Sequence, residues 1–131
     1  MCFSATASFG AGVVLSVVGV AAIKKTVSPS QIPFASIPLL FAMQQFTEGF
    51  LWLALSDPAY ASLQQVTTFN FLFFAQVAWP VWVPFAILKL DPKEKRRLIE
   101  KILVAMGALV SLYLAYCLMN YPVEASIVGY H

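Results

Sequence analysis

Four apolar runs, each about 20 residues long, constrain this sequence more than any other feature. They cover residues 5–23, 36–55, 67–88 and 98–119. A helix needs about 20 apolar residues to cross the hydrocarbon core, and its backbone groups must be satisfied within the segment. The chain is 60% hydrophobic and 11% charged, whereas soluble domains average about 25% charged residues. We therefore predict an all-α integral membrane bundle of four transmembrane helices, forming one domain over residues 1–131.

The basic residues lie on one side of the predicted membrane. The eight Lys and Arg residues are Lys24, Lys25, Lys89, Lys93, Lys95, Arg96, Arg97 and Lys101. The second loop, 56–66, and the tail, 120–131, contain none. The positive-inside rule makes loops one and three cytoplasmic, so both termini should face outward. The net charge of +2 does not argue for a nucleic-acid partner.

Small residues recur every seven positions in the first two runs. The two series are Ala5, Gly12, Gly19 and Ala35, Ala42, Gly49, Ser56. Small residues let helix backbones approach closely in lipid, so we expect these two helices to pack together. In the third run, Pro80 and Pro84 predict a kink or a change of tilt, not an end of the helix.

A group of polar side chains lies inside the second and third runs. Glu48 is interpreted as the only ionisable side chain within a span, and such a group costs about 2.5–3.5 kcal/mol at a helix centre. At about 1.5 Å per residue, Gln44, Gln45, Glu48 and Gln76 all fall within about 5 Å of the midplane. Glu48 is either a functional ligand or proton carrier, or a hydrogen-bond partner of the glutamines that fixes helix packing.

A second polar layer is predicted nearer the outer surface. It comprises Asn70, Cys117, Asn120, Cys2 and Ser4, with Glu124 and His131 able to fold over it. A disulfide between the two cysteines is geometrically open, and so are two free thiols. A metal site would draw on Cys2, Glu48 and His131, but no metal-binding motif appears. The sequence identifies no cofactor.

Two motifs carry a family resemblance. The start Met-Cys-Phe-Ser-Ala, and the second-helix pattern of Gln44, Gln45, Glu48, Gly49 and Trp52, resemble an uncharacterised family of small multi-pass bacterial membrane proteins. The resemblance covers about the first 55 residues and brings no activity with it. It implies a bacterial plasma-membrane location and directs attention to Cys2, Ser4, Gln45 and Glu48.

Three functions fit these observations. The first is a binding module or accessory subunit with a polar intramembrane site around Glu48. The second is a membrane-embedded enzyme, hydrolase-like and possibly metal-dependent, with its site in the outer half of the bilayer. The third is a proton- or ion-coupled transporter that acts as an oligomer. The expected partners are the lipid bilayer and either further copies of the chain or a larger membrane complex.

Overall fold

Four long helical segments make up the computed structural model, which describes residues 4–126. They are α1 (Ala5–Lys24), α3 (Ile37–Ser56), a continuous segment from α4 (Gln64–Leu72) through the π-helix η3 (Phe73–Ala78) to α5 (Trp79–Leu90), and α6 (Arg97–Asn120). Short elements join them: η1 (Pro29–Gln31), α2 (Ile32–Ala35), η2 (Pro58–Leu63) and η4 (Glu94–Arg96). The described residues contain no strand. The helices begin and end within three residues of the predicted runs.

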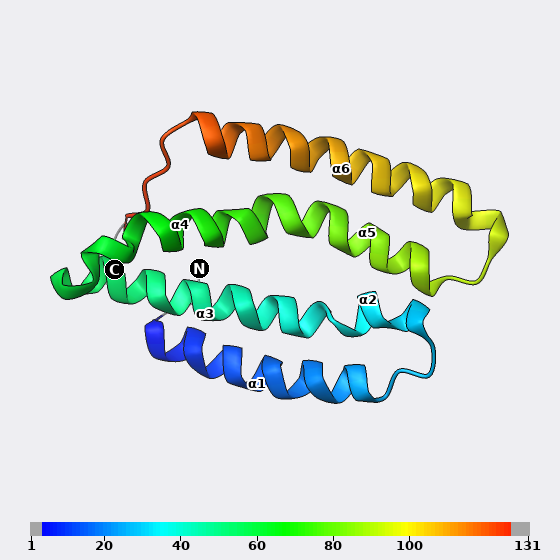
Figure 1. The fold of residues 1–131 in the computed structure, drawn as a ribbon, viewed down its shortest axis with the longest axis horizontal. Helices are drawn as coiled ribbons and strands as arrows, with labels where there is room; N and C mark the ends of the chain where they lie inside the picture. The colour runs from blue at the N-terminus through cyan, green and yellow to red at the C-terminus, as the bar shows by residue number, and fades with distance from the viewer. Residues whose placement is uncertain (1–3, 127–131) are drawn as a thin grey trace.

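The long segments lie side by side in chain order, each antiparallel to the one before it (Figure 1). α3 packs between α1 on one side and α4 on the other, while α6 packs on α5 and η3. The turns from α1 to α2 and from α5 to α6 lie at one end of this row, and η2 lies at the other. All eight basic residues are therefore in or next to the turns at the α1–α2 end.

Small residues set the contact between α1 and α3. Ser8, Gly12 and Gly19 are the buried residues of α1. A Cβ atom on Gly12 would lie 3.0 Å from the Phe46 ring, and one on Gly49 would lie 2.9 Å from the Phe9 ring. Each aromatic ring thus fills the space left by a glycine on the facing helix. The expected pairing of the first two helices is confirmed.

The third segment stays helical through both prolines but changes direction near its middle (Figure 1). The six-residue π-helix, with the Trp79 backbone N–H donating to the Phe74 carbonyl, ends two residues before Pro80. Pro84 has no N–H, so the Pro80 carbonyl lacks its usual helical donor. The backbone of Gly107 on α6 lies directly against that carbonyl oxygen. Pro84 and Gly107 together allow α5 and α6 to meet backbone to backbone.

Three stretches of the described residues are long and apolar enough to cross a membrane: Ala5–Lys24, Pro58–Leu90 and Glu94–Asn120. α3 has the length, at 20 residues, but it is not among them. Gln44, Gln45 and Glu48 lower its mean hydropathy. Large apolar side chains such as Val17, Leu109 and Leu112 are about two-thirds exposed. An all-helical protein with such apolar outer faces is suited to lipid.

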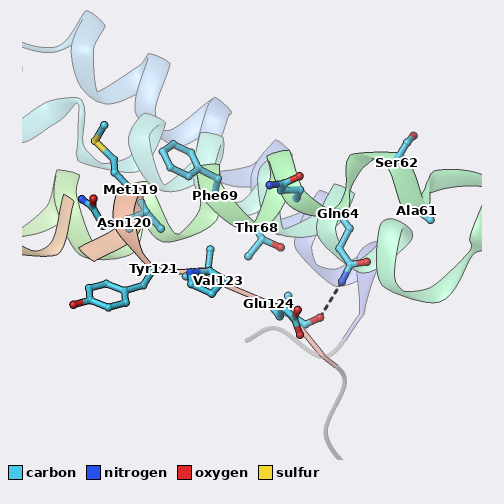
Figure 2. A pocket seen from close by; sticks show the side chains of 14 residues that line it. Ala61, Ser62, Gln64, Thr68, Phe69, Met119, Asn120, Tyr121, Val123 and Glu124 are labelled. Atoms are coloured by element: carbon cyan, nitrogen blue, oxygen red, sulfur yellow. Dashed lines mark hydrogen bonds between the residues drawn. The ribbon is translucent and has the colours of Figure 1, made fainter. Parts of the chain in front are cut away.

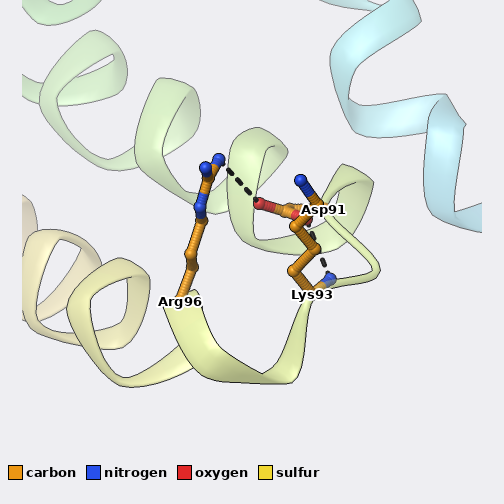
Figure 3. Close-up of polar contacts among 3 residues, drawn as sticks. All are labelled: Asp91, Lys93 and Arg96. Atoms are coloured by element: carbon orange, nitrogen blue, oxygen red, sulfur yellow. Dashed lines mark hydrogen bonds and ion pairs between the residues drawn. The ribbon is translucent and has the colours of Figure 1, made fainter.

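The turn between α5 and α6 is organised by Asp91 (Figure 3). Its carboxylate accepts the Lys93 backbone N–H at 2.8 Å and lies 3.9 Å from the Arg96 guanidinium. The hydrogen bond from the Lys93 backbone, together with the nearby Glu100 carboxyl group and the Arg96 charge, holds the pKa of Asp91 below its ordinary value despite partial desolvation. The turn is therefore held best when Asp91 is ionised.

Candidate functional site

Glu48 lies inside the fold on α3, the helix that packs against α1 on one side and α4 on the other. Its side chain is 2% exposed. The Gln45 side-chain amide donates a hydrogen bond to Glu48 Oε2 at 3.0 Å, as expected for residues three apart on one helix face. A buried carboxyl group of this kind can hold a proton or accept a hydrogen bond from a ligand, and the amide beside it fixes its orientation.

The two neighbouring glutamines serve different contacts. Gln44 accepts a hydrogen bond from Trp79 Nε1 at 2.6 Å, and the Trp79 ring stacks on Phe41 with centroids 4.1 Å apart. Gln44 therefore links α3 to α5, whereas Gln45 forms a hydrogen bond with Glu48 on its own helix. Sequence spacing alone does not separate these roles, because the partner of Gln44 lies on another helix.

The other two members of the predicted polar set do not join Glu48 through a hydrogen bond. Asn70 is exposed and donates to the Val66 carbonyl of its own helix at 2.9 Å. Gln76 is half-buried in the π-helix, and its side chain forms no hydrogen bond within residues 4–126. In the part of the chain that the structure describes, the polar cluster consists of the Gln45–Glu48 pair and, separately, the Gln44–Trp79 pair.

Four side-chain polar atoms of the described residues are buried without a hydrogen-bond partner. One is Glu100 Oε2, near the turn between α5 and α6, and the others are Ser8 Oγ, Trp52 Nε1 and Thr68 Oγ1. Trp52 follows Glu48 by one turn on α3, and Ser8 and Thr68 belong to the two helices that flank α3. Counted along each helix, all three lie within about two turns of the η2 end. An unsatisfied buried polar group is costly, so this end of the fold retains hydrogen-bonding capacity. The one sign of this group in the sequence is the position of Trp52, four residues after Glu48.

The predicted metal set cannot be assembled, since Cys2 and His131 lie outside the described residues. Within residues 4–126 no group of three His, Cys, Asp or Glu residues could hold a metal ion. Cys117 is half-buried, and its pairing with Cys2 also lies outside the described part. The metal site and the disulfide stay predictions.

The interpretation of Glu48 as the only ionisable side chain within a span is wrong. Glu100 lies in the first turn of α6, inside the run predicted at 98–119, and is 6% exposed. Its Oε2 atom is buried without a hydrogen-bond partner among the described residues. The basic residues next to Glu100 suggest a solvated loop. The sequence therefore gives no sign that Glu100 turns inward.

Comparison with known proteins gives a family and no activity. No curated protein and no solved structure matches the chain. A family model described as a family of unknown function, DUF6629, matches residues 1–131. This agrees with the resemblance to an uncharacterised family inferred from the two motifs. The chain therefore belongs to the DUF6629 family of unknown function.

Proposed function

We propose that this protein is a membrane-embedded binding module whose site is the Gln45–Glu48 pair. The observation that carries the proposal is a carboxyl group 2% exposed, held by an amide at 3.0 Å, in a helix flanked by apolar helices. Ionisable groups at membrane depth are costly and usually functional. The ligand class is an amphipathic molecule, or a partner helix, that presents a hydrogen-bond donor to Glu48.

The rival role for Glu48 is structural, and other residues already supply much of the packing. α1 and α3 are joined by Gly12, Gly19 and Gly49, and α3 is tied to α5 through Gln44. Glu48 takes no part in these contacts. This favours a ligand role for Glu48.

We further propose that the four segments cross the bacterial plasma membrane with both termini outside. The basic residues gather at the α1–α2 end of the row, while η2 and the tail from residue 120 carry none. Such an asymmetry places the basic end in the cytoplasm. In this orientation Glu48 lies below the outer surface, and a ligand reaches it from the outer leaflet or the lipid phase.

A ligand-stabilisation experiment tests the binding role. Purified protein in detergent is heated with and without total lipid extract from its host membranes, and Glu48→Gln is compared with wild type. A ligand at 100 times its Kd stabilises the folded state by about 2.7 kcal/mol, so the extract should raise the wild-type Tm more than that of Glu48→Gln. The exposed Glu94→Gln variant is the matched control. Equal Tm shifts in all three proteins would leave Glu48 without a binding role.

A further inference from the structure

A second candidate site lies at the η2 end of the fold, between α4, the end of α6 and the segment that follows it (Figure 2). The pocket has a volume of about 980 Å³. Its polar lining residues are Ser62, Gln64, Gln65, Thr68, Asn120 and Glu124. The Gln64 side-chain amide donates to the Ala125 carbonyl at 3.0 Å, and this bond holds the segment after α6 across the start of α4.

A buried polar atom in this pocket has no partner. Thr68 is 4% exposed, and its Oγ1 makes no hydrogen bond within residues 4–126. Thr67, the neighbouring threonine, instead donates to the Leu63 carbonyl of its own helix at 2.8 Å. Figure 2 shows Thr68 between the α4 ribbon and the segment that carries Val123 and Glu124. The Thr68 hydroxyl is therefore an unsatisfied polar group in the wall of the pocket.

The charges around the pocket favour a cation. Glu124 is the one charged residue of its lining, which includes no Lys or Arg. The α6 helix ends at the pocket, and Leu118, Met119 and Asn120 from its last turn line it. Carbonyl groups in the last turn lack helical donors and carry the negative end of the helix dipole. An anion in this pocket would therefore have no positively charged side chain as a partner.

The positive end of the neighbouring helix is directed elsewhere. The Gln64 backbone N–H is already bonded to the Ala61 carbonyl, because η2 runs directly into α4. The exposed start of that helical run lies at Pro58, where Asp57 Oδ1 accepts the Ala59 N–H at 2.9 Å. The first N–H group of α4 is therefore not free to attract an anion.

We propose that this pocket binds an ammonium group that carries N–H donors, as in a primary amine. Glu124 supplies the charge, and the Thr68 hydroxyl with the amide oxygens of Gln65 and Asn120 accepts the N–H groups. Phe69 and Tyr121 in the lining provide apolar surface for the carbon chain next to the ammonium group. The group belongs either to a free small amine or to the headgroup of an aminophospholipid. This site is independent of Glu48.

Binding of ethanolamine to the protein in a detergent without aminophospholipid tests the free-amine source. Isothermal titration should show saturable binding, at least tenfold weaker for Glu124→Gln and about fivefold weaker for Thr68→Val. Choline, which has no N–H donors, should bind at least tenfold more weakly than ethanolamine. Glu94→Gln, at the opposite end of the fold, should bind like wild type.

Nanodiscs test the lipid source. If ethanolamine does not bind in detergent, native mass spectrometry of protein released from phosphatidylethanolamine nanodiscs should show retained lipid that Glu124→Gln loses. Either result supports the proposal and assigns the source of the ammonium group. Absence of both kinds of binding overturns it, as does binding that neither Glu124→Gln nor Thr68→Val weakens. Equal affinity for choline and ethanolamine would also overturn it.

Discussion

Replacing Gly107 with alanine should destabilise the protein by about 1–2 kcal/mol, because no space exists for a methyl group at this position. A Cβ atom there would approach the Pro80 carbonyl oxygen far more closely than the 3.0 Å below which such contacts essentially never occur. The obstacle is backbone, which cannot rotate away as a side chain would. α5 and α6 would have to separate by about 1 Å along their contact.

Two opposing effects set the magnitude. Overpacking a tight contact costs about 1–3 kcal/mol, and the absence of a flexible neighbour places Gly107 in the upper part of that range. Alanine is a better helix former than glycine by about 1 kcal/mol, which offsets part of the cost. Separation of the helices would also lengthen the bond from Ser111 Oγ to the Val77 carbonyl, now 2.7 Å.

The free energy of unfolding, measured by titrating detergent-purified protein with SDS, provides the test. Gly10→Ala is the matched control, because Gly10 also lies in a long helix but has nothing within 4 Å of the added methyl group. It should be neutral or stabilising by up to about 1 kcal/mol. If Gly107→Ala were as stable as Gly10→Ala, the close approach of α5 and α6 at Pro80 would be refuted.

Three further predictions follow from the turns and helix contacts. Ser111→Ala should lower the free energy of unfolding by about 0.6 kcal/mol in the SDS titration, a typical value for an interhelical hydrogen bond in lipid. Ser16→Ala, which loses only a bond to its own helix, should lower it less. Equal losses would contradict the interhelical role of Ser111. Single cysteines at Ser62 and Glu94, in a background without native cysteines, should react with a membrane-impermeant maleimide in intact cells only at Ser62; the reverse pattern would invert the proposed topology. Because the folded-state pKa of Asp91 is depressed, the stability that it contributes is present above its unfolded-state pKa, near 3.8, and is lost as pH falls through the folded value. Far-UV circular dichroism melts between pH 5 and pH 3 should show a smaller loss of Tm for Asp91→Asn than for wild type, and identical losses would show that Asp91 does not stabilise the turn.

The helices are predictable from the sequence because each depends on a local run of apolar residues. The α1–α3 contact is predictable as well, since glycines seven apart mark the face that approaches a partner. The π-helix is not predictable, because Pro80 and Pro84 allow a kink, a break or a wider turn. In the structure this region packs against Gly107 and Ser111 of α6, which lie far along the chain.

The candidate sites are predictable only in part. The pairing of Gln45 with Glu48 follows from their spacing of three on a helix. That Gln44 binds Trp79 depends on the placement of α5, which no local pattern encodes. The pocket at the η2 end joins residues about 60 apart in the chain, as in the bond from Gln64 to Ala125. Thr68 therefore has no distinguishing mark in the sequence.

A native mass spectrum of the detergent-purified protein tests the central claim, that Glu48 is a ligand site within the membrane, most directly. Wild type and Glu94→Gln should carry a bound molecule of one defined mass at a fixed ratio to the chain, and Glu48→Gln should lose it while keeping the same helical circular dichroism. The same bound mass in all three proteins, or the mass of the chain alone in wild type, would contradict the claim and leave Glu48 as a packing residue.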